Sequence, residues 1–250
     1  MKRQHSLQLT IAAILLLSLP AAAQTAKQPV PRKILFIGNS LTYSNNGIYY
    51  HLEKLAALAA PPLVVSAEKS VFGGASLKTL WERREPRELI GSGAYDVVVL
   101  QEDLPETNVS DFKEFARQFV AHIRKSGSRP VLLMAWDYPR LGWITMPEIA
   151  GAHLDIGKEL GVDVAPVGLA WQRASKERPD LNLYARDREH PSIYGTYLAT
   201  NVVYATIYGQ NPATLDYLPE GVTAETGAFL RRIAWETLQE NRAQLGRPAN

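Results

Sequence analysis

The first residue of this sequence with clear chemical potential is a serine that directly follows an apolar segment. Residues 33–37 are mostly apolar and favour a β-strand, and Gly38, Asn39 and Ser40 follow them at once. This order predicts a buried parallel strand that turns into a helix, with Ser40 at the carboxyl end of the strand. Ligands bind at that edge of open α/β sheets, so Ser40 is either a reactive hydroxyl or only the cap of the next helix.

A second motif, far along the chain, contains the groups that a reactive serine needs. Asp187 stands three residues before His190, in a polar segment that precedes a predicted helix. At this spacing a carboxylate can accept a hydrogen bond from one imidazole nitrogen and leave the other nitrogen as a base. A serine hydroxyl is a weak nucleophile at neutral pH unless such a base removes its proton. The same spacing also occurs by chance, and both residues would then be ordinary loop residues.

The chain around these motifs alternates between strand and helix patterns. Strands are predicted at residues 33–37, 63–66, 95–100, 130–135 and 162–165. Helices are predicted at residues 48–60, 77–90, 111–126, 147–160, 167–176, 191–208 and 224–241. This alternation predicts an α/β fold in which helices cover both faces of a parallel sheet. Pro191 is expected at the first position of its helix, where proline is well tolerated.

The motifs resemble those of the SGNH/GDSL hydrolase superfamily of esterases and acylhydrolases. The first family block, Gly-Asp-Ser-Leu, is matched by Gly-Asn-Ser-Leu at residues 38–41, and the last block, Asp-x-x-His, by residues 187–190. The second block contains a glycine before a helix, and Gly74 within residues 73–76 is its preferred equivalent. The order and the spacing of these blocks agree along almost the whole chain.

This resemblance implies a flavodoxin-like, three-layer α/β/α sandwich with a five-stranded parallel sheet. It also implies a catalytic triad of Ser40 as nucleophile, His190 as base and Asp187 as the carboxylate that orients the histidine. In that superfamily the oxyanion is bound by the N–H of the nucleophile, by the N–H of the second-block glycine and by an asparagine side chain. The first two donors correspond to the N–H groups of Ser40 and Gly74.

The third family block, Gly-x-Asn-Asp, is missing from this sequence. Gln101 follows the strand predicted at residues 95–100, at the place where the asparagine is expected. Its carboxamide offers the same donor on a longer stem, so Gln101 is our candidate for the third oxyanion donor. The alternative is that Gln101 only ends the strand.

The N-terminus predicts that the protein is exported. The chain has 250 residues, of which 46% are hydrophobic and 21% are charged, as expected for one globular domain. Residues 1–23 combine a basic start, a short apolar centre and a small-residue end, which predicts a signal peptide for secretion or for export to the periplasm. A retained membrane anchor is the alternative. Residues 24–32 are expected to form a linker and residues 33–250 the hydrolase domain.

Charge and cysteine content exclude several classes of function. Residues 1–23 carry two basic and no acidic residues, so the rest of the chain is formally neutral. Neutrality argues against a sequence-independent nucleic-acid binder, which needs a strong positive field. The absence of cysteine excludes a thiolate nucleophile and a cysteine zinc site. We expect no metal, no organic cofactor and no stable membrane anchor after cleavage of the signal peptide.

Aromatic residues near the predicted site suggest a carbohydrate ligand. Trp136 and Trp143 follow the strand predicted at residues 130–135, where their ring faces can contact a sugar ring. With Asn39 they are our candidate substrate-binding residues, and the alternative is that the two tryptophans pack beneath the loop. We expect the substrate to be a short-chain acyl ester, such as an O-acetyl group on a carbohydrate.

Two other functions remain open at this stage. Glu102, Asp103 and Asp137 also follow strand ends, and carboxylates in that position can hydrolyse glycosides or hold a divalent cation. A protein of the same fold can also bind carbohydrate without catalysis, and the altered third block favours that possibility.

Overall fold

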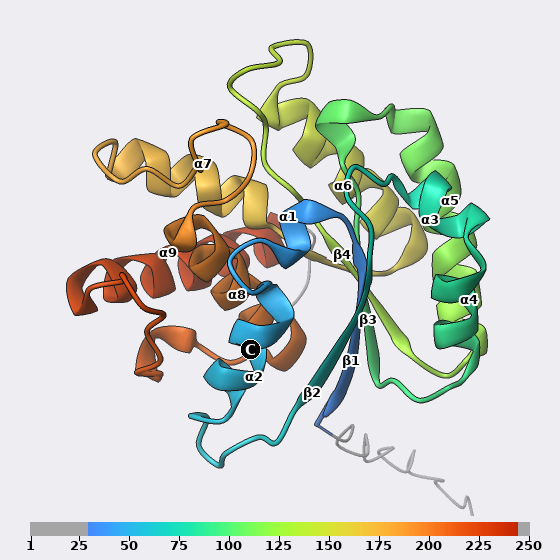
Figure 1. The fold of residues 1–250 in the computed structure, drawn as a ribbon, viewed down its shortest axis with the longest axis horizontal. Helices are drawn as coiled ribbons and strands as arrows, with labels where there is room; N and C mark the ends of the chain where they lie inside the picture. Colours follow the sequence, from blue (N-terminus) through green and yellow to red (C-terminus); the bar gives the residue numbers. More distant parts are fainter. Residues whose placement is uncertain (1–29, 245–250) are drawn as a thin grey trace, which may run out of the picture.

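The computed structural model describes residues 30–244, which form a five-stranded parallel sheet between two layers of helices (Figure 1). The strand order is β2-β1-β3-β4-β5, and every neighbouring pair is parallel. The strands are β1 (Lys33–Gly38), β2 (Ser66–Val71), β3 (Val97–Gln101), β4 (Arg129–Leu133) and β5 (Asp163–Ala165). The α/β/α sandwich expected from the sequence is confirmed. The predicted signal peptide, residues 1–23, lies outside the described residues, as does most of the predicted linker.

Two hydrophobic cores, one on each face of the sheet, hold the three layers together. On one face Ile34 and Phe36 of β1 pack with α2, α7, α8 and α9. On the other face Leu35 and Ile37 pack with α3, α4, α5 and α6. Because successive side chains of a strand point to opposite faces, a strand buried on both faces must be apolar throughout. The helices are α1 (Ser40–Tyr43), α2 (Ile48–Ala56), α3 (Leu77–Glu82), α4 (Arg84–Gly91), α5 (Val109–Lys125), α6 (Met146–Leu160), α7 (Val167–Glu177), α8 (Ile193–Tyr208) and α9 (Ala224–Gln244).

The prediction of the second strand was wrong. Residues 63–66, of which the first three are apolar, were expected to form it, but β2 spans residues 66–71, which are mostly polar. Because β2 lies at the edge of the sheet and pairs only with β1, most of its side chains reach solvent and need not be apolar. Val64, which the prediction placed in the strand, is 80% exposed.

The helix predicted at residues 77–90 is two helices, α3 and α4, separated at Arg83. Arg83 has an extended backbone, with φ −72° and ψ 142°. Pro86 explains the break, because in a continuous helix it would lack a needed N–H and would clash with the carbonyl of Glu82. In the structure Pro86 lies in the first turn of α4, where proline is tolerated. The expected helix at residues 191–208 also begins later, since Ser192 is its cap and Pro191 precedes it.

The fold brings the ends of distant segments to one edge of the sheet. The strands β1 and β3 are neighbours and end at Gly38 and Gln101, while β4, beside β3, leads into the segment at residues 134–145. Within residues 30–244 no helix is both long and apolar enough to cross a membrane.

Candidate active site

Ser40 is the first residue of α1, immediately after the end of β1. Asn39 caps this short helix, because its side-chain Oδ1 accepts a hydrogen bond from the N–H of Leu41 at 3.0 Å. Gly38 is required before the turn, since a Cβ there would lie 2.6 Å from Oε1 of Gln101. The side chain of Ser40 therefore lies at the carboxyl edge of the sheet, on a turn whose conformation is fixed by the Asn39 cap and by close packing against Gln101.

The segment that ends in His190 folds into a tight turn around Asp187. The N–H groups of Glu189 and His190 both donate to Oδ1 of Asp187 at 3.0 Å. Arg188, between Asp187 and Glu189, has a positive φ of 61°. Partial burial opposes ionisation of Asp187, but these hydrogen bonds and the one from the imidazole outweigh it and lower the pKa of the carboxyl group. Asp187 is thus held as a carboxylate against the histidine ring.

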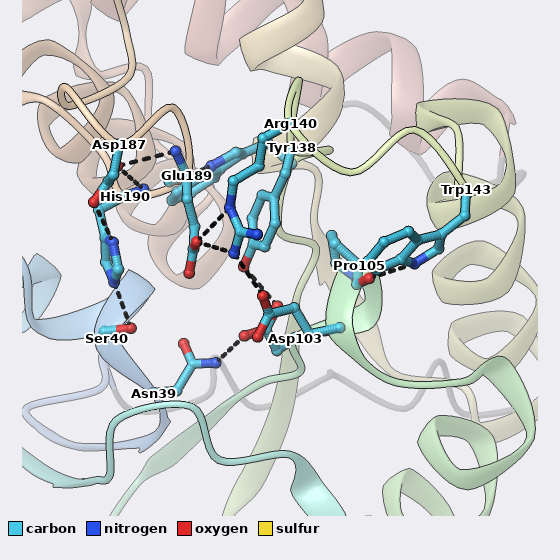
Figure 2. Close-up of polar contacts among 12 residues, drawn as sticks. Asn39, Ser40, Asp103, Pro105, Tyr138, Arg140, Trp143, Asp187, Glu189 and His190 are labelled. Atoms are coloured by element: carbon cyan, nitrogen blue, oxygen red, sulfur yellow. Dashed lines mark hydrogen bonds and ion pairs between the residues drawn. The ribbon is translucent and has the colours of Figure 1, made fainter.

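The structure brings Asp187, His190 and Ser40 into one chain of hydrogen bonds (Figure 2). His190 Nδ1 lies 2.8 Å from Oδ2 of Asp187, and His190 Nε2 lies 2.8 Å from Oγ of Ser40. If Nδ1 carries the proton and donates it to the carboxylate, the lone pair of Nε2 faces the serine hydroxyl. This is the arrangement in which an imidazole can remove the proton of a serine during attack on a carbonyl carbon.

The loop that follows β2 lies beside the serine turn. Gly38 pairs with Val71 in the sheet, and the N–H of Phe72 donates to the carbonyl of Gly38 at 3.1 Å. Gly74 follows with a positive φ of 65°, a conformation that favours glycine. Within the described chain the N–H groups of Ser40 and Gly74 have no hydrogen-bond acceptor, which leaves both for a ligand.

Gln101 does not have the position that an oxyanion donor requires, and this prediction is corrected. The side chain is buried, with 1% exposed, and its Oε1 accepts hydrogen bonds from the N–H of Asn39 at 2.8 Å and from Oγ1 of Thr42 at 3.0 Å. Its Nε2 is also buried and has no partner among the described residues. Gln101 therefore supports the serine turn from below with its carbonyl oxygen, and its amide does not reach the surface of the site.

Two of the three predicted substrate-binding residues are buried. Asn39 is fully buried, and its Nδ2 donates to Oδ2 of Asp103 at 2.7 Å. Trp136 is also fully buried, where it stacks on Trp171 with ring centroids 4.0 Å apart. These two predictions are wrong, because both side chains hold the protein framework and neither reaches solvent. Trp143 is 67% exposed, with its indole N–H bound to the carbonyl of Pro105 at 2.8 Å (Figure 2).

Two of the three carboxylates that suggested a different mechanism, Glu102 and Asp103, are enclosed by the protein. Glu102 is 1% exposed and accepts hydrogen bonds from the N–H groups of Leu77 and Asp103, and burial raises its pKa to about 7. Asp103 is 3% exposed, and burial raises its pKa to about 6, with hydrogen bonds from Tyr138 and Asn39 opposing the rise. Neither group faces a ligand, which argues against a glycosidase that uses this pair. Asp137 is partly buried, and its pKa is also raised by burial.

No group of three or more histidine or acidic side chains in residues 30–244 is arranged to hold a metal ion. Sequence reasoning did not indicate that Asp103, Tyr138, Arg140 and Glu189 connect the two motifs (Figure 2). Their only signal in the sequence is that they follow a strand end or adjoin His190.

Known structures share this fold, although no protein-family model and no curated protein matches the sequence. A protein assigned to the SGNH hydrolases from Slackia heliotrinireducens is 25% identical, with a TM-score of 0.59 over 70% of this chain and 98% of the other. A DUF4886 family protein from Bacteroides uniformis is 17% identical, with a TM-score of 0.69 over 83% of this chain and 95% of the other. An acetyl-xylooligosaccharide esterase from Geobacillus stearothermophilus is 18% identical, with a TM-score of 0.59 over 70% and 94%. This chain therefore has the fold of known SGNH hydrolases, and the order of the motifs at residues 38–41, 73–76 and 187–190 agrees with its resemblance to the SGNH/GDSL superfamily.

Proposed function

We propose that this protein is a serine esterase that hydrolyses short-chain acyl esters through an acyl-enzyme. Ser40 is the nucleophile, His190 is the general base and then the general acid, and Asp187 orients the imidazole and stabilises its protonated form. The observation that carries the proposal is the pair of 2.8 Å contacts that connect Asp187 to His190 and His190 to Ser40.

The reaction takes place in two steps that use the same residues. Ser40 Oγ attacks the carbonyl carbon while Nε2 of His190 takes the hydroxyl proton, and the alcohol leaves with that proton when the ester bond breaks. Water then attacks the acyl-enzyme, again giving a proton to His190, and Ser40 regains its proton as the acid is released. The N–H groups of Ser40 and Gly74 bind the negative oxygen of each tetrahedral intermediate.

The burial of the Gln101 amide fits a site in which two backbone N–H groups bind the oxyanion. Because Gln101 Nε2 is buried, the proposal assigns the oxyanion to the N–H groups of Ser40 and Gly74. Removing one oxyanion donor typically lowers kcat by about 10²–10³-fold, so a two-donor site still supports catalysis over the uncatalysed reaction.

We further propose that the ester is an O-acetyl group on a carbohydrate outside the cytoplasm. Support comes from the exposed indole of Trp143, whose N–H is bound to Pro105 so that the ring is fixed and its face can contact a sugar ring. One structural neighbour is an acetyl-xylooligosaccharide esterase, and its likeness extends to the fold. The predicted signal peptide agrees with an extracytoplasmic substrate.

The test is hydrolysis of p-nitrophenyl acetate by the purified protein and by the Ser40→Ala variant. Ser110→Ala is the matched control, since Ser110 is an exposed serine on α5, outside the site. We expect the native protein and Ser110→Ala to turn over equally and Ser40→Ala to lose all but background activity. A serine-reactive phosphonate should add one adduct mass to the native protein and none to Ser40→Ala.

Two other outcomes would contradict the proposal. Equal activity of Ser40→Ala and the native protein would exclude a serine mechanism and would redirect attention to the carboxylates. No turnover and no phosphonate adduct, together with binding of an acetylated glycan, would identify a carbohydrate-binding protein of the same fold.

A further inference from the structure

The loop that connects β4 to α6, residues 134–145, contacts Asp103, which binds Asn39 beside Ser40, and Glu189, which precedes His190. This β4–α6 loop belongs to none of the motifs that identified the site, and it has no helix or strand of its own. Tyr138 binds Asp103, and Arg140 binds Glu189, the residue before His190 (Figure 2). Trp136 also binds Glu189, through the backbone carbonyl. The arrangement suggests that the loop sets the distance between nucleophile and base.

The first connection runs from Tyr138 to the serine turn. The hydroxyl of Tyr138 donates to Oδ1 of Asp103 at 2.6 Å, and Oδ2 of Asp103 accepts from Nδ2 of Asn39 at 2.7 Å. All three side chains are buried, with 3% or less exposed, so water does not replace these hydrogen bonds. Asn39 also caps α1 through its Oδ1, and its orientation therefore fixes the backbone that carries Ser40.

The second connection runs from the same loop to the histidine turn. The indole N–H of Trp136 donates to the carbonyl of Glu189 at 2.9 Å, and Nε of Arg140 donates to the Glu189 carboxylate at 2.9 Å. Glu189 directly precedes His190, and its own N–H donates to Asp187. Both the backbone and the side chain of this residue are thus held by the β4–α6 loop.

The positive charge of Arg140 offsets the repulsion between the carboxylates near Glu189. Asp103, Glu106 and Glu189 lie close enough that the two glutamates raise the pKa of the aspartate, after the larger effect of burial. Arg140 forms ion pairs with both Glu106 and Glu189, and no other basic side chain in residues 30–244 pairs with either of them. Without the guanidinium, repulsion between the carboxylates would push Glu189 away from the loop.

We infer that the β4–α6 loop is a brace that aligns Ser40 with His190, and that Tyr138 and Arg140 are positioning residues within it. The inference rests on the proposed function, because it assigns these residues a role in holding the proposed nucleophile and base. Neither residue contacts the Ser40 or His190 side chain, so each acts through another: Tyr138 through Asp103 and Asn39, and Arg140 through Glu189.

The nucleophile side of the brace is tested with Tyr138→Phe, which removes one hydroxyl and keeps the ring. A misplacement of about 1 Å in an active site can lower the rate by about 10²-fold, so we expect a loss of about 10-fold in kcat with KM unchanged. The matched control is Tyr204→Phe, which removes the hydroxyl of another buried tyrosine, on α8, whose partner is Gln210 just beyond the end of that helix. That control should leave kcat and KM unchanged.

Variants of Asp103 separate hydrogen bonding from charge. In Asp103→Asn the side-chain oxygen can still accept from Asn39, and the new amide can donate to the oxygen of Tyr138, so both connections persist without the charge. We expect Asp103→Asn to keep kcat within about threefold of the native value. Asp103→Leu should lower kcat at least as much as Tyr138→Phe does. Equal losses for both Asp103 variants would overturn the role of the hydrogen bonds.

The histidine side is tested with Arg140→Met, for which a loss of about 10-fold in kcat at unchanged KM is expected. Arg117→Met is the matched control, because Arg117 forms an equally close pair with Glu159 on the outside of α5 and α6. A rise in KM with unchanged kcat in Tyr138→Phe or Arg140→Met would instead show a direct contact with substrate and would overturn the inference.

Hydrogen exchange tests the brace without any substrate, and so separates its failure from failure of the proposed esterase function. Tyr138→Phe should speed amide exchange in residues 39–44, and Arg140→Met should speed it in residues 185–190, while neither changes exchange in α8. If exchange in these turns equals that of the Tyr204→Phe and Arg117→Met controls, the brace does not exist, whatever the activity. If exchange changes but Ser40→Ala remains active, the brace stands and the serine mechanism fails.

Discussion

Oε1 of Gln101 accepts a hydrogen bond from the backbone N–H of Asn39 at 2.8 Å, directly beneath the serine turn. The same oxygen accepts from Oγ1 of Thr42 on the other side of Ser40. One buried carboxamide therefore holds the residues on both sides of the proposed nucleophile. The third family block, which supplies a catalytic amide in the superfamily, is replaced here by an amide that supports the nucleophile turn from below.

Replacement of Gln101 by methionine should destabilise the protein and weaken catalysis. Gln101→Met leaves the N–H of Asn39 and the hydroxyl of Thr42 without their buried acceptor, and an unsatisfied buried group costs about 1–3 kcal/mol. We expect the free energy of unfolding, measured in urea, to fall by at least about 2 kcal/mol. Gln118→Met on α5, which loses only a contact with Glu114, is the control. An unchanged free energy of unfolding in Gln101→Met would contradict this role.

Replacement of Asp187 by asparagine should lower kcat far more than it raises KM. The amide of Asp187→Asn can donate to Nδ1 of His190, which favours the tautomer whose Nε2 carries the proton and cannot accept one from Ser40. A loss of kcat of about 10³–10⁴-fold is expected, with the phosphonate reaction slowed to a similar extent. Asp180→Asn, which alters an exposed carboxylate paired with Arg178, is the control. Retention of kcat within about 10-fold would show that Asp187 does not orient the base.

Replacement of Gly74 by alanine should perturb the oxyanion site through the backbone. A Cβ at this position meets no atom within 4 Å, so the cost arises from the positive φ of 65° and not from a clash. A left-handed conformation costs a non-glycine residue about 1–2 kcal/mol, and relief of that strain would rotate the Gly74 N–H. We expect a loss of about 10–100-fold in kcat with little change in KM. Gly127→Ala, also at positive φ in open space but far from the site, is the control.

The sequence predicts that Ser40, His190 and Asp187 come together, as they do in the structure, because each of the two motifs is local. The local sequence determines the backbone conformation of the turn after β1 and of the four residues from Asp187 to His190. The parallel sheet then needs only to bring these two segments to one edge. The strand prediction failed at β2 for the opposite reason. An edge strand with an exposed face has no apolar pattern, and the apolar residues before it, including Val64, do not lie in the sheet.

The surroundings of the triad could not be predicted because they depend on tertiary contacts. Gln101, Trp136 and Asn39 have side chains that suit either a ligand or a buried framework, and composition does not distinguish these uses. The decision depends on which groups the fold places nearby: Trp171 stacks on Trp136, and Asp103 binds Asn39. The connection from Tyr138 to Asp103 spans two loops, and no periodicity or spacing in the sequence indicates it.

Removal of the Trp143 indole should affect large substrates only. The ring is exposed on the segment before α6, so Trp143→Ala should raise KM for an acetylated xylo-oligosaccharide by about 10-fold, in line with the loss of one aromatic contact of about 1.5 kcal/mol. KM for p-nitrophenyl acetate should not change, because that substrate is too small to reach beyond the serine. An equal change for both substrates would indicate a general disturbance of the loop.

The buried carboxyl group of Glu102 should make the protein less stable as pH rises. Its pKa is raised from 4.5 to about 7 by burial, so between these two pH values the folded state binds more protons than the unfolded state. Under this condition the free energy of unfolding falls with increasing pH. Between pH 5 and pH 8 the fall due to Glu102 should be about 2–3 kcal/mol, since one pKa unit corresponds to 1.36 kcal/mol. Asp103, with its pKa raised to about 6, contributes a fall of the same sign.

Urea unfolding of the native protein and of Glu102→Gln at pH 5 and pH 8 tests this assignment. At pH 5 the variant should be the less stable protein, because a glutamine has one acceptor oxygen for the N–H groups of Leu77 and Asp103. At pH 8 the difference should shrink or reverse, since only the native protein then carries a buried charge. Glu148→Gln on α6 is the control, as hydrogen bonds from Thr145 lower the pKa of Glu148 and keep it ionised throughout this range. If the free energies of unfolding of the native protein and of Glu102→Gln differ by the same amount at both pH values, Glu102 stays charged in the folded state. Any pH dependence of stability would then have to come from groups other than Glu102.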